Sequence, residues 1–417
     1  MSTSPNASDV LVVGGGMAGL AAAIGQRTNG ASVTLVERAP EFGEVGAGLQ
    51  LAPNATRLLQ RWGLLEKVME IGVKPRHLVF RDALSGEEIA RQDVGAQFQA
   101  TYGAPYVVVH RPDLHRILVE ECHRLGVELA NGVEIEKVET AGDTATAFAS
   151  TGETYRAGVV LGADGIRSAL RPAVSGDQPV GSAYVAYRGT RPIAEVENAQ
   201  DLEDVVVYLG PNCHLVQYPL RKGELLNTVA VFKSPSFERG IEQVSGVAEL
   251  EAELQEAYKD CVPEVRNSLK NLTASIRWPM YDRDPIRNWV DGRMALIGDA
   301  AHPMLQYLAQ GACQAFEDAA VLQDVTAATV FAGEGVDAGA WDAALAAYNE
   351  ARAERTATVQ RTARVWGESW HVEPGIARSL RNTLFKNRGD DYRYTDWLYG
   401  QDAAPGIAAP NLAAARA

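Results

Sequence analysis

The hydrophobic pattern near the start of the chain predicts a strand, a helix and a second strand in close succession. Residues 9–13 form a short, nearly continuous apolar run, which is typical of a strand buried on both faces. Small and apolar residues then recur at helical spacing from Met17 up to Gly30, a residue type common at helix C-termini. A second apolar run occupies residues 32–36. The pattern therefore predicts a β-α-β unit.

The rest of the chain mixes both periodicities. Short runs rich in Val and Ile predict further strands at residues 132–135, 158–161, 204–208 and 228–232. The last two are typical of an antiparallel sheet in a second region. From residue 318 to 365 the pattern becomes helical and Ala-rich, and the Ala/Pro-rich residues 403–417 are expected to fray.

Length and composition indicate a multidomain globular protein. At roughly 150 residues per domain, 417 residues suggest two to three domains. Hydrophobic residues make up 46% and charged residues 22%, which excludes a disordered or fibrous chain. The formal net charge of -14 disfavours a broad surface for nucleic acid or anionic membranes, although it leaves local basic pockets open.

Cysteine usage and targeting signals favour the cytoplasm. Cys122, Cys213, Cys261 and Cys313 lie far apart without the paired spacing of a zinc site, so we expect free thiols and no bound metal. The apolar run at residues 10–24 has no preceding Lys or Arg and is interrupted by glycines, unlike a signal peptide. No other stretch approaches the ~20 apolar residues of a membrane helix.

A glycine motif joins the first strand to the first helix. Gly14, Gly16 and Gly19 enclose Met17 and Ala18 in the G-x-G-x-x-G pattern. The first glycine permits a tight turn, the second lets the backbone approach a pyrophosphate, and the third lets helix and strand pack closely. The helix N-terminus offers N–H groups and a positive dipole to phosphate.

An acidic residue completes this dinucleotide fingerprint. Glu37 ends the second predicted strand at about 20 residues beyond the motif, where a carboxylate binds the ribose hydroxyls of an adenosine. These residues alone do not distinguish NAD from FAD.

Two later segments repeat the combination of glycine and aspartate. Asp164 and Gly165 lie in the sequence GADGIRS, and Asp299 lies in LIGDAAHP. Each segment alone favours the simpler reading, a turn at a strand end that contains an Asp. Together with the glycine motif, and in this order, they resemble the motifs of the flavoprotein aromatic hydroxylases. In that family the Asp299 position binds the ribityl chain of FAD, and the Asp164 segment serves both FAD and nicotinamide binding.

The resemblance extends from about residue 9 to residue 397. Within the family it is strongest to the 3-hydroxybenzoate 6-hydroxylases, followed by the salicylate hydroxylases. It is carried by residues 41–50, 187–190, 213–220, 278–283, 305–308 and 394–398. The resemblance assigns these residues to cofactor binding: Gly14, Gly16, Met17, Ala18, Gly19, Glu37, Arg38, Gly48, Gln50, Arg111, Asp164, Gly165, Asp299 and Gly311. Without it, Arg111 reads equally well as a solvated arginine at a helix start.

The resemblance implies an α/β (α+β) fold in three parts. A discontinuous, Rossmann-like FAD-binding domain with a parallel sheet would comprise residues 1–75, 103–180 and 271–330. Residues 76–102 and 181–270 would form a smaller substrate domain with an antiparallel sheet. Residues 331–417 would supply C-terminal helices and a tail.

The implied activity is NAD(P)H-dependent hydroxylation of a phenolic benzoate, with FAD, NADH or NADPH, and O2. The reduced flavin would form a C4a-hydroperoxide that attacks the ring. The preferred reaction is 3-hydroxybenzoate to 2,5-dihydroxybenzoate (gentisate), and salicylate 1-hydroxylation to catechol is the alternative. Family habit also suggests a cytoplasmic homodimer acting on a small aromatic molecule.

A base beside the phenol would make the ring more nucleophilic, because a phenol with pKa near ~10 is mostly neutral at cytoplasmic pH. His214 is the candidate, since imidazole titrates near ~6.5. In a strand, His214 and Tyr218 share one face. The resemblance adds Tyr218 and Gln306 as orienting groups, and Arg188 is a candidate donor to the substrate carboxylate.

Several readings stay open on residue type alone. His214 also suits a packed core histidine, and His302 is expected to be structural. Trp278, Met280 and Tyr307 suit either pocket walls or plain core. Two rival functions keep the fold: a flavin reductase that yields only peroxide, and an FAD-binding redox regulator without turnover. A plain NAD-dependent dehydrogenase does not account for the two later motifs.

Overall fold

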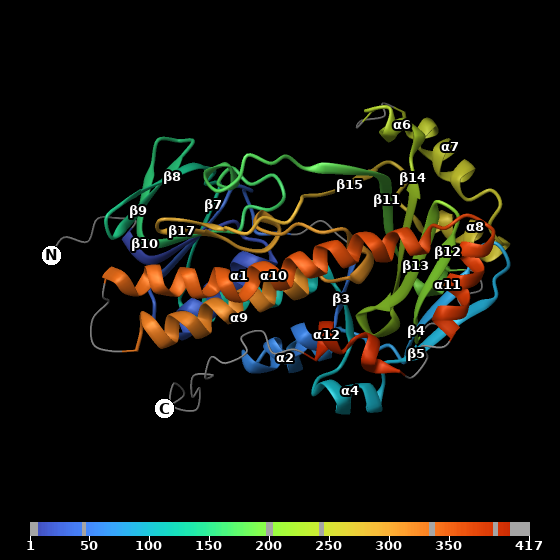
Figure 1. Cartoon of the computed structure of the whole chain (residues 1–417), viewed down its shortest axis with the longest axis horizontal. Coiled ribbons are helices and arrows are strands. Elements are labelled where there is room, and N and C mark those ends of the chain that lie inside the picture. The colour runs from blue at the N-terminus through green and yellow to red at the C-terminus, as the bar shows by residue number, and fades with distance from the viewer. Residues whose placement is uncertain are drawn as a thin grey trace.

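The computed structural model describes residues 7–43, 47–196, 203–241, 246–332, 338–386 and 391–400. In space, two large sheets lie at opposite ends of the described structure, and the long helix α10 (Ala338–Trp370) extends from one sheet to the other (Figure 1). This mixed α/β architecture, with one mainly parallel and one mainly antiparallel sheet, confirms the predicted fold class.

The first sheet contains the predicted β-α-β unit. Strand β1 lies between β2 and β10 and is parallel to both. Val10 and Val12 at its centre are completely buried, as expected for a central strand on which the first helix packs. The strands of this sheet are β1 (Ala7–Val13), β2 (Val33–Glu37), β7 (Glu128–Asn131), β8 (Ile135–Ala141), β9 (Thr144–Ala149), β10 (Thr154–Gly162), β16 (Val290–Asp291) and β17 (Met294–Leu296).

One strand prediction for this region was wrong. The apolar residues at 132–135 were expected to form a strand, but residues 132–134 connect β7 to β8. Gly132 has a φ of +72°, a left-handed conformation that ends the strand. The strand predicted at residues 158–161 is confirmed as part of β10.

The second sheet contains both of the strands that were predicted for an antiparallel sheet. The runs at 204–208 and 228–232 fall in β12 and β14, and β13 pairs antiparallel with both. Strand β4 pairs parallel with β12. Its strands are β4 (His77–Asp82), β5 (Glu88–Asp93), β11 (Val180–Pro192), β12 (Val205–Gly210), β13 (Cys213–Leu220), β14 (Leu225–Lys233) and β15 (Trp278–Asp282). A separate small sheet pairs β3 (Gly48–Leu51) with β6 (Val107–His110).

Helices cover the sheets and join them. Helix α1 (Met17–Thr28) begins within the glycine motif. Gly30, with a φ of +96°, lies two residues beyond its end. The other α-helices are α2 (Pro53–Arg61), α3 (Leu65–Ile71), α4 (Ala96–Tyr102), α5 (Arg111–Leu125), α6 (Pro235–Glu238), α7 (Val247–Ala257), α8 (Pro263–Ser268), α9 (Gly311–Thr329), α11 (Ile376–Lys386) and α12 (Asp396–Tyr399). Short 3-10 helices occupy η1 (Arg171–Ala173), η2 (Ile193–Glu195), η3 (Arg221–Gly223), η4 (Leu269–Asn271), η5 (Gly298–Ala300), η6 (Gln306–Leu308) and η7 (Tyr392–Tyr394). The helical C-terminal pattern therefore begins seven residues before residue 318, at the start of α9.

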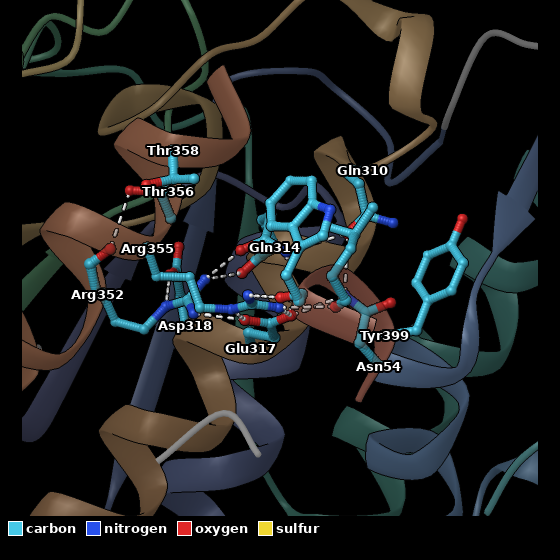
Figure 2. A network of polar contacts seen from close by, with 12 residues as sticks. Asn54, Gln310, Gln314, Glu317, Asp318, Arg352, Arg355, Thr356, Thr358 and Tyr399 are labelled. Atoms are coloured by element: carbon cyan, nitrogen blue, oxygen red, sulfur yellow. Dashed lines mark hydrogen bonds and ion pairs between the residues drawn. The ribbon is translucent and has the colours of Figure 1, made fainter. Parts of the chain in front are cut away.

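A buried polar network joins α9 and α10 (Figure 2). Arg352 of α10 donates to Glu317 at 2.5 Å and to Asp318 at 2.8 Å, and all three side chains are at most 1% exposed. Arg355 donates to Glu317 at 2.7 Å and to the Trp397 carbonyl at 2.9 Å. The network thus ties the C-terminal segment to the two central helices.

All four cysteines are free thiols with buried side chains: Cys122, Cys213, Cys261 and Cys313. In the described ranges, no helix is long and apolar enough to cross a membrane, and no group of three or more His, Cys, Asp or Glu side chains could hold a metal ion. Residues 44–46 of the resembling segment 41–50 and the predicted tail at 403–417 lie outside the described residues.

Candidate functional site

A cavity of about 830 Å³ brings the predicted site residues together from both sheets. It is lined by Gly14, Gly16, Met17, Ala18, Glu37, Arg38, Gly48, Gln50, Arg111, Asp164, Gly165, Arg188, His214, Tyr218, Asp299, Gln306 and Gly311. Gly19 does not line it. Residues far apart in the sequence thus line one cavity. The glycine motif lies toward the parallel sheet, and His214 lies toward the antiparallel sheet.

The glycine motif forms a backbone cradle at the start of α1. Gly14 has a φ of +110°, and a Cβ there would collide with the Ala163 carbonyl. Gly19 faces the Gly14 carbonyl so closely that a Cβ would also collide, so its role is to let the helix pack on the strand. The α1 N-terminus therefore has its N–H groups available for a phosphate.

The acidic residues border the cavity as expected. Glu37 accepts from the Gly15 amide at 2.7 Å and from the Ala39 amide at 2.8 Å, which fixes its carboxylate beside the glycine motif. Each carboxylate oxygen still has a lone pair for a hydroxyl group. Asp299 is exposed within the cavity wall, at the start of η5.

The cavity lining includes a buried acceptor and a buried donor that have no hydrogen-bond partner. Burial raises the pKa of Asp164, and its Oδ2 accepts from the Ala169 amide at 2.8 Å while Oδ1 stays unpartnered. Gln310, which caps α9, has an unpartnered Nε2 and is 1% exposed. A buried acceptor and a buried donor without partners are costly unless a ligand satisfies them. Together with the backbone cradle, they fit a dinucleotide such as FAD.

At the other end of the cavity, β13 alternates as predicted. His214, Val216 and Tyr218 all line the cavity, which confirms that they share one face of the strand. Burial raises the pKa of Tyr218, partly offset by the charge of Arg188, so its hydroxyl stays protonated. A Cβ on Gly48 would lie 2.7 Å from the Tyr218 hydroxyl oxygen, so a glycine is required where this ring crosses β3.

Two arginines make this part of the cavity positive despite the negative net charge of the chain. Arg188 donates to the Gln306 Oε1 at 3.1 Å, and its Nε is buried without a partner. Its pKa is lowered, first by burial and then by the nearby charge of Arg111. Arg111 begins α5 and also lines the cavity.

His214 is 1% exposed and lies among aromatic rings. Its ring centroid is 5.0 Å from that of Trp370 and 5.6 Å from that of Tyr307. Burial lowers the pKa of His214 well below its usual value, with a smaller contribution from His371. The imidazole is therefore neutral at ordinary pH and has one nitrogen able to accept a proton.

Sequence reasoning missed the apolar wall and a second histidine. Phe80, Trp366, Trp370 and Phe385 line the cavity and pack on one another with centroids 5.0 to 6.4 Å apart. The Nε2 of His371 lies 2.8 Å from the Nδ1 of His214. These residues come from β4 and the C-terminal helices, and no motif marks them.

The three residues whose role the sequence left open lie in different environments, and Met280 is the one buried in the core without lining the cavity. Tyr307 lines the cavity, whereas Trp278 and Met280 do not. Trp278 is 39% exposed, and the Arg188 guanidinium lies over its ring at 5.9 Å. His302 is 1% exposed and its Nε2 lies 2.6 Å from Asp318, in agreement with a structural role.

Comparison with known proteins matches this architecture. The family model described as "FAD binding domain" matches residues 7–363. The 3-hydroxybenzoate 6-hydroxylase of Polaromonas naphthalenivorans is 35% identical over 96% of this chain and 98% of the relative. A 3-amino-4-hydroxybenzoate 2-monooxygenase of Streptomyces platensis is 36% identical over 95% of this chain and 96% of the relative.

A solved salicylate hydroxylase in complex with its substrate is similar along the whole chain. Its TM-score is 0.75, with 25% identity, and the match covers 98% of this chain and 100% of that structure. These matches confirm the resemblance that the motifs indicated. The chain therefore belongs to the FAD-binding family of flavoprotein monooxygenases that includes the 3-hydroxybenzoate 6-hydroxylases.

Proposed function

We propose that this monooxygenase hydroxylates the ring of a phenolic benzoate, with 3-hydroxybenzoate as substrate and 2,5-dihydroxybenzoate (gentisate) as product. The observation that carries the proposal is the position of the buried, neutral His214 in the same cavity as Tyr218, Arg188 and the glycine cradle. The 3-hydroxybenzoate 6-hydroxylases at about 35% identity support this choice of substrate.

The glycine motif, Glu37, Asp164 and Asp299 would hold FAD along the parallel-sheet end of the cavity. FAD supplies electron transfer from NADH or NADPH and activation of O2 for ring hydroxylation. The unpartnered Asp164 Oδ1 and Gln310 Nε2 would gain hydrogen bonds from the bound cofactor.

His214 would act as the general base toward the phenol. Its Nδ1 is occupied by His371, so Nε2 is the ring nitrogen that a cavity ligand can reach. A neutral imidazole can take the phenolic proton at Nε2, which leaves electron density on the ring for attack. The hydroxyl of Tyr218, protonated at ordinary pH, can donate to the phenolate oxygen.

The substrate carboxylate would bind near Arg188 and Gln306. The buried Nε of Arg188 lacks an acceptor, and a benzoate carboxylate would supply one that also carries the opposite charge. The aromatic part of the lining, formed by Phe80, Trp366, Trp370 and Phe385, would offer apolar surface to the substrate ring and exclude water from it. An acid-bearing aromatic molecule therefore suits both parts of the lining.

Salicylate 1-hydroxylation is the second candidate, because the salicylate hydroxylase structure has the same fold and covers the whole chain. The two reactions differ in which ring carbon faces the cofactor. The test is to purify the protein, record its visible spectrum, and follow NADH and NADPH oxidation with 3-hydroxybenzoate, salicylate and 4-hydroxybenzoate. Products are identified by mass and retention time.

A flavin spectrum with gentisate formed from 3-hydroxybenzoate supports the proposal. Catechol from salicylate would favour the second candidate. Peroxide as the sole product with all three phenols would favour a flavin reductase, and bound FAD with negligible turnover would favour a redox regulator.

Replacing the base gives a sharper test. His214→Ser should lower the hydroxylation rate by about 10²- to 10⁴-fold, the usual contribution of a general base, while FAD stays bound. The matched control is His123→Ser on the exposed end of α5. Hydroxylation by His214→Ser at the parent rate would rule out His214 as the base.

A further inference from the structure

The hydrogen-bond partner of the His214 ring comes from a distant part of the chain. His371 directly follows α10, and its Nε2 lies 2.8 Å from the His214 Nδ1. The two rings are stacked, with centroids 5.0 Å apart and planes at 22°. This is a hydrogen bond between two imidazoles, so one ring donates an N–H and the other accepts with a bare nitrogen.

The structure holds the His371 ring from several sides. Tyr184 of β11 stacks on it at 4.4 Å between centroids, and Tyr307 of η6 meets it edge-on at 5.6 Å. The Asn212 amide donates to the His371 carbonyl at 3.2 Å, which anchors the backbone. These contacts position the His371 ring against His214, and His214 in turn lines the cavity.

Both imidazoles are neutral. His371 is 6% exposed, and its pKa is lowered to about 3, first by burial and then by the positive charge of Arg381 on α11. Among the described residues, the groups that interact with this ring are His214, Tyr184, Tyr307 and Arg381, and none of these is a carboxylate that would favour a charged ring. A neutral ring retains one bare nitrogen and can act as a hydrogen-bond acceptor.

We propose that His371 is a positioning residue for the hydroxylation: its Nε2 accepts the Nδ1–H of His214 and so keeps the His214 Nε2 bare toward the cavity. The reverse arrangement would place the proton of His214 on Nε2 and abolish its function as a base. When the phenol O–H breaks and an Nε2–H bond forms, the resulting imidazolium keeps its hydrogen bond to His371. This inference rests on the proposed function, because it assigns a partner to the proposed base.

The test measures the ionisation of a bound phenol without turnover. The FAD-bound protein is titrated with 3-hydroxy-4-nitrobenzoate, whose phenolate absorbs visible light, in the absence of reductant. The apparent pKa of the bound phenol is compared in the parent, His371→Leu and His371→Gln. Leucine keeps the volume without an acceptor, whereas the glutamine side-chain oxygen reaches the Nε2 position.

We expect His371→Leu to raise the apparent pKa of the bound phenol by about one unit, a tenfold loss of phenolate at pH below that pKa. His371→Gln should restore the parent value, and kcat should follow the phenolate fraction while KM changes little. The control His123→Gln should behave as the parent. If His371→Leu does not retain FAD, the shorter His371→Asn, whose amide does not reach the Nε2 position, replaces it.

Two outcomes would overturn the inference. An unchanged phenol pKa in the variant lacking an acceptor would show that His371 does not set the tautomer of His214. An equal shift in the leucine and glutamine variants would show that His371 acts only through packing. Because the readout needs neither O2 nor NADH, the two failures are distinguishable: a parent enzyme that ionises the probe but forms no gentisate would refute the proposed function, whereas the phenol pKa of the variants alone tests the hydrogen bond from His214 to His371.

Discussion

At the scale of the residue, burial determines what the histidines of this protein can do. His214 and His371 are 1% and 6% exposed, and burial is the main cause of the lowered pKa of each. An exposed imidazole would be partly charged near pH 6.5, whereas these two stay neutral. The same burial that makes His214 available as a base therefore also makes the folded state sensitive to acid.

We predict that the free energy of unfolding falls as the pH drops below about 6.5, the usual pKa of an unfolded histidine. The unfolded chain then takes up protons that the folded pair does not, at up to about 1.4 kcal/mol per pH unit for each histidine. For His371 this loss continues down to pH about 3. Above pH 6.5 the pair has no such effect.

Urea unfolding of the FAD-bound protein between pH 5.5 and 8 checks this prediction. His371→Gln should flatten the pH dependence below pH 6.5 by about one proton, whereas the exposed His123→Gln should leave the slope unchanged. A slope in His371→Gln equal to that of the parent would show that His371 is protonated in the folded state.

At the scale of the element, α9 and α10 are joined by buried charge. Burial raises the pKa of Glu317, but Arg352 and Arg355 oppose it strongly enough that the net pKa is lowered. The carboxylates of Glu317 and Asp318 therefore stay charged inside the protein (Figure 2). Asp318 also accepts from the Gly298 amide at 2.9 Å, so the network fixes the segment that carries Asp299.

Removing the central cation should be costly. Arg352→Met leaves two buried carboxylates with fewer partners, and we expect a loss of about 3–5 kcal/mol in the free energy of unfolding. The control is Arg361→Met on the same helix, whose ion pair with Glu354 is exposed, and its effect should stay below about 1 kcal/mol. Equal losses in urea unfolding would refute a special role for the buried network.

At the scale of the whole molecule, the cavity is the junction of parts that are remote in sequence. Its walls come from the parallel sheet, the antiparallel sheet and residues 391–399 of the C-terminal segment. A ligand that fills it contacts all of them at once. We propose that a discontinuous FAD-binding domain and a substrate domain meet at this junction, as the sequence predicted. The homodimer and the cytoplasmic location stay predictions.

We therefore expect FAD to stabilise the whole chain. At a free concentration 100 times its dissociation constant, FAD should add about 2.7 kcal/mol to the unfolding free energy of the deflavinated protein and raise its melting temperature. Gly14→Val should abolish this rise, because its Cβ would collide with the Ala163 carbonyl. A melting temperature that does not respond to FAD in the parent would contradict the assignment of the cavity.

The sequence by itself determined the features that depend on local periodicity. The apolar run before Gly14 predicted β1, and alternation along residues 213–220 predicted that His214 and Tyr218 share a face. Backbone geometry has a short range, so these patterns suffice without the rest of the chain. The strand predicted at 132–135 was wrong because Gly132, in the left-handed region, ends β7 and begins the connection to β8.

Only the tertiary structure decided which side chains meet. His371 lies 157 positions from His214, and Arg188 lies 118 positions from its partner Gln306. The first contact arises where the residue after α10 reaches β13, and the second where η6 reaches β11. No local pattern encodes either packing. The sequence thus specified the chemical groups, and the fold specified their protonation and their neighbours, because burial and contact depend on the whole chain.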